Sequence, residues 1–467
     1  MNYLIAIDIG TSSTRSVAFS TEGQLLCSKS VSYPIQSPQP GWQEQDPQSI
    51  LDAVIKTVQK VVKSVGAAPI GISLSAAMHS LLAVDEQGEV LTPCIIWADN
   101  RSVEYAEELK NTELGKAIYR HTGTPIHPMS PLCKIAWLRD KQPEIFSKAY
   151  KFVGIKEYVL FHLFGQWRVD YSIASAMGMF DKQTLDWYAP ALELAGITAA
   201  RLPELVPPVF VLNPLKAEAA EELGLDSQTP FVIGASDGCL ANLGALALEK
   251  GETVITLGTS AAIRMTTQAS TYDEQERIFN YLLVEDLYIA GGASNNGGIV
   301  FQWFAEAFLR IDSKEKAFKS IKKIRKIPAG SEGLLFLPYL TGERAPVWDS
   351  KSKGVFFGVT KNHNKLHFQR AVLEGIFLNV LQIGKALEET VGSMETIYVN
   401  GGLAQIDILV QMLADIFGKA IHIQENEEGS AFGAFLMGMK ALGLLGDFAE
   451  AKNMIRIQKT YMPDAVN

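Results

Sequence analysis

The sequence predicts an α/β protein in which two similar domains hold a nucleotide between them. The first observation lies in residues 3–15, where an apolar segment reaches Asp8 and breaks into Gly10-Thr11-Ser12-Ser13. Two apolar segments around such a tip are typical of a β-hairpin, and the tip offers N–H groups and hydroxyls to phosphate oxygens. The second observation is a related hairpin at residues 254–260. Either hairpin alone is compatible with a plain turn, so the pair is what favours a nucleotide.

The first half of the chain is expected to begin as a β-meander. Strands are predicted over residues 3–8, 14–20 and 24–32, with turns at Gly10 and Gly23. A helix then starts at Asp46-Pro47, because apolar residues recur at helical spacing as far as Val65. A buried strand follows at residues 69–74. This order differs from the βαβ alternation of a dinucleotide fold and predicts a mixed sheet covered by helices.

The second half repeats this order. Strands are predicted over residues 253–257, 261–265, 281–284 and 288–290, and a helix follows from about residue 297 to 309. We interpret the repetition as a weak structural duplication. The chain of 467 residues is long enough for two or three domains. The predicted domains are residues 1–245 and 246–467.

Composition excludes several classes of protein. The net charge of −9 gives no general attraction for nucleic acid or anionic membranes, so a site for an anion must supply its own Arg, Lys or Mg²⁺. The 4 cysteines form no CxxC pair, which argues against a zinc site or a disulfide framework. No basic segment precedes the first apolar run, and the apolar residues 431–445 are too few to span a bilayer. The chain is therefore expected to be soluble and cytoplasmic.

The sequence does not support two common nucleotide-binding folds, the P-loop fold and the Rossmann fold. No GxxxxGK[ST] motif is present, and no GxGxxG follows a strand. The paired hairpins instead resemble those of the actin-like, ribonuclease H-like ATPases. The predicted fold class is thus α/β, with two such domains and a cleft between them.

Several separate motifs resemble those of the FGGY carbohydrate kinases along nearly the whole chain. One family signature covers residues 129–140, and Lys141 stands where the family prefers Glu, Asn, Gln or His. The second signature covers residues 354–374. Further matches are residues 96–101, Gly234-Ala-Ser-Asp237-Gly238, residues 337–344 and Asn400-Gly-Gly402. The resemblance implies an ATP-dependent enzyme that phosphorylates a sugar hydroxyl with Mg²⁺.

Asp237 is the predicted catalytic base. It follows the apolar residues 230–234, so its carboxylate is expected at a strand end. A sugar hydroxyl must lose its proton as it attacks phosphorus, and a nearby carboxylate can accept that proton. The family places its base at the matching position, whereas the alternative is a simple helix cap. Asp8 resembles the family's acid that helps to hold Mg²⁺, and Asp237 is the second predicted metal group.

The resemblance also assigns the nucleotide site. The two hairpin tips would meet the terminal phosphates of ATP from opposite sides, and glycines of the second domain would approach the adenosine end. The predicted residues are Gly10, Thr11, Ser12, Ser13, Arg15, Gly258, Thr259, Gly298, Gln302, Gly401 and Gly402. For Arg15 the alternative is an ion pair with a neighbouring acid.

The sugar is expected mainly on the first domain. Met78-His79 resembles the family's sugar-contacting Met-His pair, and an indole and an acid in the next loop suit C–H faces and hydroxyls. The predicted substrate-binding residues are Met78, His79, Trp97, Asp99, Arg101, His127 and Asp237. Residues 76–80, 97–102 and 123–131 resemble the gluconate kinase branch of the family. Candidates to hold a substrate carboxylate, which the sequence does not rank, are Arg101, His127, His79 and Lys156.

The sequence therefore predicts transfer of the γ-phosphate of ATP to a sugar acid, D-gluconate, giving 6-phospho-D-gluconate. Two alternatives stay open. One is a kinase of the same family for xylulose or another ketose or polyol, and the other is an actin-like ATPase that needs no sugar. The predicted partners are the sugar acid and ATP, with no nucleic acid and no membrane. The sequence does not fix the oligomeric state and leaves a homodimer open.

Overall fold

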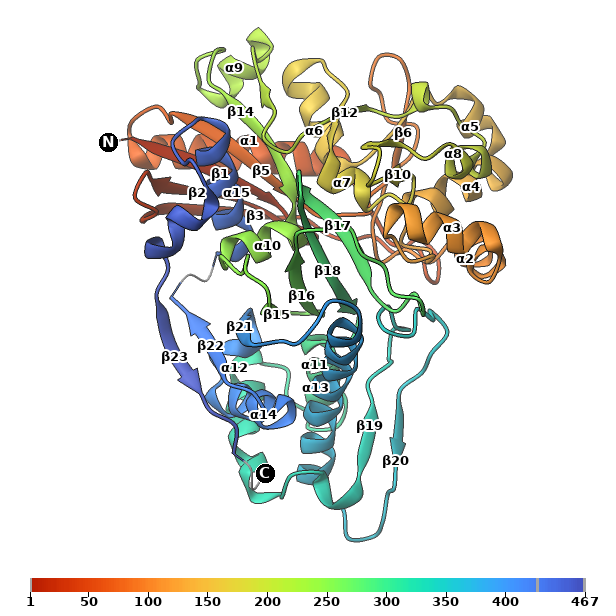
Figure 1. Cartoon of the computed structure of the whole chain (residues 1–467), viewed down its shortest axis with the longest axis vertical. Helices are drawn as coiled ribbons and strands as arrows, with labels where there is room; N and C mark the ends of the chain where they lie inside the picture. Colours follow the sequence, from red (N-terminus) through yellow and green to blue (C-terminus); the bar gives the residue numbers. More distant parts are fainter. Residues whose placement is uncertain (1, 426–427, 465–467) are drawn as a thin grey trace.

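The computed structural model describes residues 2–425 and 428–464, and its two large sheets each carry the core of one domain (Figure 1). The first sheet has the strand order β13-β14-β5-β1-β2-β3. Its strands are β1 (Tyr3–Ile9), β2 (Ser13–Ser20), β3 (Leu25–Ser32), β5 (Gly71–Ala76), β13 (Val211–Leu212) and β14 (Phe231–Ser236). The predicted meander at the start of the chain is thereby confirmed.

The second sheet has the strand order β17-β18-β16-β15-β21-β22-β23. Its strands are β15 (Glu252–Leu257), β16 (Ala261–Thr267), β17 (Phe279–Val284), β18 (Leu287–Ser294), β21 (Thr396–Asn400), β22 (Ile421–Gln424) and β23 (Ile457–Tyr461). The run β18-β16-β15-β21-β22-β23 repeats the pairing directions of β3-β2-β1-β5-β14-β13 strand by strand. The predicted duplication is therefore real, and β17 is an added edge strand.

Helices cover both faces of each sheet. The helices that pack against the two sheets are α1 (Pro47–Val65), α6 (Ile155–Phe164), α9 (Ala217–Leu223), α10 (Asp237–Gly244), α11 (Gly298–Ala307), α13 (Lys365–Thr390), α14 (Asp407–Phe417) and α15 (Gly429–Ala441). Helices α1, α6 and α9 pack on one face of the first sheet, and α10 and α15 pack on its other face. In Figure 1 the blue α15 lies among the red strands of the first sheet. The end of the chain thus returns to the first domain.

The predicted helix after Asp46 shows how local sequence sets these elements. Asp46 accepts a hydrogen bond from the N–H of Ser49 at 3.0 Å, and Pro47 takes the first turn, where a missing N–H costs nothing. Gly66 ends the helix with a φ of 75°. The face that carries Ile50, Val54 and Val58 is buried against the sheet.

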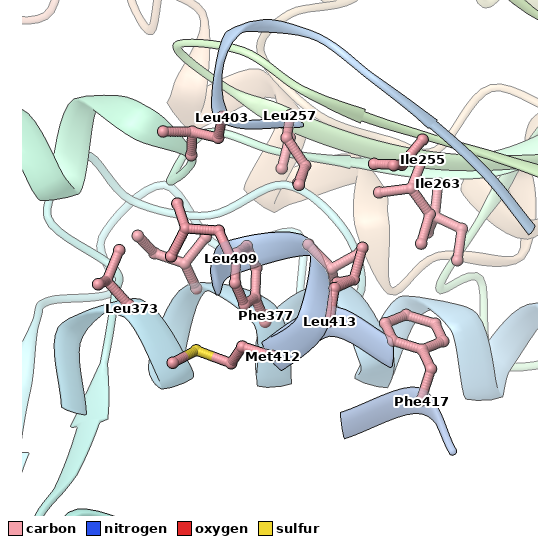
Figure 2. Close-up of a cluster of buried hydrophobic side chains, with 14 of the residues drawn as sticks. Ile255, Leu257, Ile263, Leu373, Phe377, Leu403, Leu409, Met412, Leu413 and Phe417 are labelled. Atoms are coloured by element: carbon pink, nitrogen blue, oxygen red, sulfur yellow. The ribbon is translucent and has the colours of Figure 1, made fainter. Parts of the chain in front are cut away.

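The core of the second domain lies between its sheet and the helices α13 and α14. Ile255 and Ile263 from the sheet contact the cluster that includes Phe377 and Leu413 (Figure 2). All four side chains are fully buried. This packing fixes the outer face of β16, so every second residue of that strand faces the first domain instead.

A lobe of short elements flanks the first sheet and carries the loops around the predicted sugar site. Its helices are α2 (Val103–Lys110), α3 (Glu113–Thr122), α4 (Pro131–Lys141), α5 (Pro143–Lys148), α7 (Tyr171–Ser175) and α8 (Ala189–Ala195). Its short strands are β4 (Glu44–Gln45), β6 (Leu82–Val84), β7 (Cys94–Ile95), β8 (Lys151–Val153), β9 (Arg168–Asp170), β10 (Phe180–Asp181), β11 (Asp186–Trp187) and β12 (Glu204–Val206). The second domain adds α12 (Lys314–Ile321) and the projecting pair β19 (Leu335–Leu337) and β20 (Val355–Phe357) (Figure 1).

Gly234 interrupts the pairing of β14 with β5 just before the predicted catalytic base. The register shifts between Val232 and Ala235, and Gly234 has a φ of 67°. A Cβ atom at Gly234 would lie 1.7 Å from the carbonyl oxygen of Leu74. Only glycine fits this bulge, which sets where the strand ends and where Asp237 begins α10.

No helix within residues 2–425 and 428–464 has both the length and the apolar character that crossing a bilayer requires.

Candidate active site

A cavity of about 140 Å³ lies between the two domains and brings together most of the predicted sugar site. Met78, His79, Trp97 and Asp237 line it. One residue from each hairpin tip, Thr11 and Ser260, also lines it. The two hairpins therefore meet at one place, as their resemblance predicts.

Asp237 lies at the end of β14 and starts α10, facing this cavity. One carboxylate oxygen accepts a hydrogen bond from the N–H of Gly238 at 2.6 Å. Burial raises the pKa of Asp237 to about 6, and the charge of Asp8 adds to that rise. A carboxylate with this pKa is ionised at neutral pH and takes up a proton readily, which suits a general base.

His79 and Trp97 are held in fixed orientations beside Asp237. The Nδ1 atom of His79 donates to the carbonyl oxygen of Ala176 at 2.7 Å, which leaves Nε2 as an acceptor. Burial and the charge of Lys134 lower the pKa of His79 to about 3, so the ring is neutral. The indole N–H of Trp97 donates to the hydroxyl of Thr11 at 2.9 Å. The predicted sugar site and the first hairpin tip are thus directly connected.

The first hairpin tip is built on the end of β1. Asp8 accepts a hydrogen bond from the hydroxyl of Ser75 on β5 at 2.7 Å. The N–H of Gly10 donates to the carbonyl oxygen of Ser13 at 3.0 Å and closes the turn around Ser12. The second tip closes in a similar way, with Gly258 donating to the carbonyl oxygen of Ser260 at 2.9 Å.

A second cavity, of about 370 Å³, adjoins the second tip. Five predicted nucleotide residues line it: Gly258, Thr259, Gly298, Gln302 and Gly402. Apolar walls come from Phe301, Ile311, Ala317 and Phe318. The glycines suit the phosphates of a nucleotide, and the apolar side chains suit its base.

Comparison with known proteins identifies the family. Residues 3–244 match the N-terminal domain of the FGGY family of carbohydrate kinases, and residues 253–442 match the C-terminal domain. The chain belongs to the FGGY family. It is 44% identical to the gluconokinase of Bacillus subtilis (strain 168), over 97% of this chain and 90% of that protein. It is 30% identical to the xylulose kinase of the same strain, over 100% of this chain and 94% of that protein.

Solved structures of the FGGY family have the same fold. The gluconate kinase of Lactobacillus acidophilus superposes with a TM-score of 0.94 at 35% identity, covering 99% of this chain and 94% of that one. A ligand-bound xylulose kinase from the same organism gives a TM-score of 0.94 at 36% identity, with the same coverage. The predicted fold class, two actin-like domains around a cleft, is confirmed.

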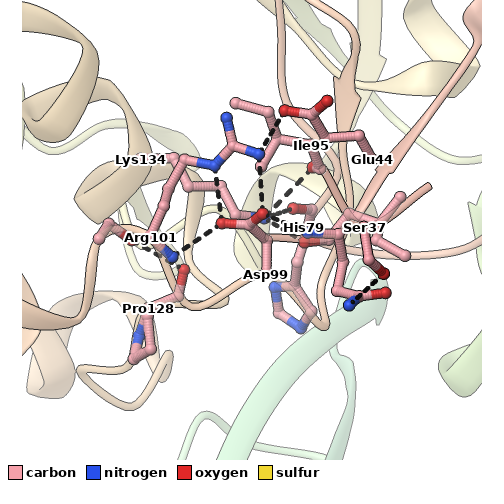
Figure 3. A network of polar contacts seen from close by, with 11 residues as sticks. Ser37, Glu44, His79, Ile95, Asp99, Arg101, Pro128 and Lys134 are labelled. Atoms are coloured by element: carbon pink, nitrogen blue, oxygen red, sulfur yellow. Dashed lines mark hydrogen bonds and ion pairs between the residues drawn. The ribbon is translucent and has the colours of Figure 1, made fainter. Parts of the chain in front are cut away.

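Two residues of this FGGY kinase that were predicted to bind the sugar, Asp99 and Arg101, instead contact each other and other protein groups. Arg101 forms ion pairs with Asp99 at 2.8 Å and with Glu44 at 2.5 Å (Figure 3). Its guanidinium also stacks on Trp42 at 3.8 Å, and Asp99 accepts from the N–H of Gln43 at 2.6 Å. Neither Asp99 nor Arg101 lines the cavity. The ion pair between Asp99 and Arg101, two residues apart, thus stabilises the loop that carries Trp97.

Other candidates differ in where they lie. His127 is buried against the ring of Trp348 and does not line the cavity. Lys156 forms a buried ion pair with Asp170 and donates to a carbonyl of β14, so it supports the strand beneath Asp237. The carboxylate-binding role that the sequence offered to Arg101 and Lys156 has no support here, because both are already paired.

Two residues that were predicted to bind the nucleotide, Arg15 and Gly401, make other contacts. Arg15 forms an ion pair with Glu428 at 2.6 Å, which is the alternative that the sequence left open. Gly401 does not line the second cavity. A Cβ at Gly401 would lie 2.6 Å from the carbonyl oxygen of Leu257, and its φ is 95°. Glycine is needed there for the approach of two strands, whereas Gly402 faces open space and the cavity.

Sequence reasoning missed three polar residues that line the cavity between the domains. They are Arg264, Tyr281 and Arg344. Arg264 interrupts an apolar strand, Ala261-Ala-Ile-Arg-Met265, and an arginine in a buried strand is a signal that sequence alone contains. Whether the Arg264 side chain points into the core or into the cavity depends on which face of β16 packs against the helices. Only the folded structure shows this.

Proposed function

We propose that this FGGY kinase transfers the γ-phosphate of ATP to the terminal hydroxyl of D-gluconate and releases 6-phospho-D-gluconate. The observation that carries the proposal is Asp237, a buried carboxylate with a raised pKa in the cavity between the two domains. The choice of gluconate rests on the 44% identity to a gluconokinase over 97% of the chain.

In the proposed reaction Asp237 accepts the hydroxyl proton while the hydroxyl oxygen forms its bond to the γ-phosphorus. The bond from that phosphorus to the bridging oxygen breaks, and the electron pair leaves with ADP. His79 and Trp97 orient the sugar, and the two hairpin tips hold the phosphates. Closure of the domains around this cavity would exclude water and limit ATP hydrolysis.

Asp8 and Asp237 are the residues that would hold Mg²⁺. The charge of Asp8 contributes to the raised pKa of Asp237, so a divalent cation suits this pair of buried carboxylates. Among the residues that the structure describes, no group of three or more His, Cys, Asp or Glu forms a metal cage. Water and phosphate oxygens would complete the coordination, and the ion would neutralise charge on the phosphates.

A second candidate, phosphorylation of xylulose, is favoured by the TM-score of 0.94 to a ligand-bound xylulose kinase. A coupled assay of ADP release with gluconate, xylulose, ribulose and glycerol decides between them. We expect gluconate to give the highest kcat/KM, and a higher value for xylulose would favour the second candidate. An ATPase rate that no sugar raises would instead support an actin-like ATPase.

The activity is also expected to fall at acidic pH. A protonated carboxyl cannot accept the hydroxyl proton, so kcat/KM for gluconate should fall as the pH drops through about 6. Below that point the loss should approach about tenfold for each pH unit. A pH profile of initial rates at saturating ATP measures this, and Asp237→Asn should remove this acidic limb. A wild-type profile that stays flat across the pKa of Asp237 would argue against this base.

A further inference from the structure

We propose that Arg264 and Arg344 together bind the carboxylate of the sugar acid and so select sugar acids over neutral sugars. The inference rests on the proposed function and names the groups that its substrate requires. Neither arginine was among the sequence-based candidates for this role.

Arg264 reaches the sugar cavity from the second domain. Its neighbours on β16, Ile263 and Met265, point into the core of that domain, so Arg264 points to the opposite side. Across the ladder stands Gly291, where a Cβ atom would lie 2.9 Å from Cγ of Arg264. The missing side chain at Gly291 therefore makes room for the stem of this arginine. Its guanidinium lies over Gly238, next to Asp237.

The guanidinium of Arg264 is buried with few partners. Only 9% of the residue is exposed. Among the described residues its guanidinium donates one hydrogen bond, to the hydroxyl of Thr256 at 3.4 Å, and its Nε atom has no partner. Within the described part of the chain it also has no ion pair. A buried guanidinium with most of its five donors unused is costly, and an anion would satisfy it.

Arg344 reaches the same cavity from the loop between β19 and β20. It is 8% exposed, its guanidinium stacks on Trp97 at 4.4 Å, and its Nε atom likewise has no partner among the described residues. The carboxylate of the neighbouring Glu343 accepts from Ser294 at 2.6 Å and from Asn379 at 2.8 Å, and among the described residues it forms no ion pair with Arg344. Arg344 therefore also presents an unused donor to the cavity.

The cavity as a whole has an excess of positive charge. Two arginines and one ionised carboxylate, Asp237, line it, and His79 is neutral. The hydroxyl of Tyr281, which also lines the cavity, has no hydrogen-bond partner among the described residues. Asp237 is engaged by the reacting hydroxyl and would also help to hold Mg²⁺, so the positive charge of the two arginines calls for an anion from the substrate. The carboxylate of a sugar acid supplies it, and a neutral ketose does not.

The test compares gluconate with D-glucitol, which carries a CH₂OH group where gluconate has its carboxylate. We expect Arg264→Met to lower kcat/KM for gluconate by about 100-fold, mainly through KM, and to change the value for glucitol by no more than about threefold. Arg344→Met should also lower the ratio of kcat/KM for gluconate to kcat/KM for glucitol. Arg264→Lys should restore part of this ratio because the charge is kept. Arg325→Met, at an exposed position of the same domain, is the matched control.

Binding of gluconate and of glucitol, measured by calorimetry without ATP, provides a readout besides turnover, and thermal melts confirm that each variant is folded. An equal loss for both ligands would overturn the inference and indicate a role in phosphate transfer or in folding. An unchanged gluconate-to-glucitol ratio would overturn it as well. The wild-type arm separates this inference from the proposed function: a wild type that prefers gluconate upholds that function even where the arginine variants refute the inference. A wild type that prefers a neutral sugar refutes both.

Discussion

Replacing Asp237 by asparagine is expected to lower kcat for gluconate by about 1,000-fold. Asparagine keeps the size of the side chain and its hydrogen bond from Gly238, but its amide cannot accept the hydroxyl proton. Binding of gluconate should stay within about threefold of wild type, because the other residues that line the cavity are unchanged. Initial rates of ADP release measure the first quantity, and calorimetry measures the second.

Asp286→Asn is the matched control for this loss of charge. Asp286 is exposed in the turn between β17 and β18, and its φ of 61° is one that asparagine adopts readily. We expect this variant to retain wild-type turnover and stability. Near-full activity of Asp237→Asn would remove Asp237 as the base. A parallel loss of gluconate binding would instead assign it to substrate positioning.

The regular elements of both sheets could be predicted from the sequence because their periodicity is local. The expected strands at residues 14–20 and 261–265 correspond to β2 and β16, and the helix after Asp46 starts where its cap predicts. The order of strands in the second sheet could not be predicted, because pairing is a long-range choice. Residues 281–284 form β17 at the edge, and β18 takes the place next to β16.

The position of a candidate site residue was predictable where the residue directly follows a strand, and less predictable where its contacts depend on distant residues. Asp237 and His79 are placed by β14 and β5, which the apolar runs indicate. Asp99 and Arg101 have residue types that suit a sugar, but they pair with each other, and only the folded loop shows this. Arg264 was missed because the inward and outward faces of β16 depend on a core built from distant helices.

Gly234→Ala is expected to have the largest effect on stability of any single methyl addition near the site. The new Cβ would lie 1.7 Å from the carbonyl oxygen of Leu74, which is backbone of the adjacent strand and cannot rotate away. The φ of 67° adds strain for any residue with a side chain. Strain and overpacking together should cost about 4 kcal/mol and lower the Tm by about 10 °C. The displaced end of β14 should also reduce kcat, because it carries Asp237.

Gly224→Ala separates the clash from the backbone strain. Gly224 ends α9 with a φ of 68°, nearly that of Gly234, yet nothing lies within 4 Å of where its Cβ would stand. It should therefore cost only about 1 kcal/mol and leave kcat unchanged. Thermal unfolding and ADP-release rates of the two variants measure the difference. Equal losses of Tm would mean that φ alone governs Gly234, and that the bulge between β14 and β5 tolerates a methyl group. A stable Gly234→Ala variant with full turnover would show that this bulge does not position the base.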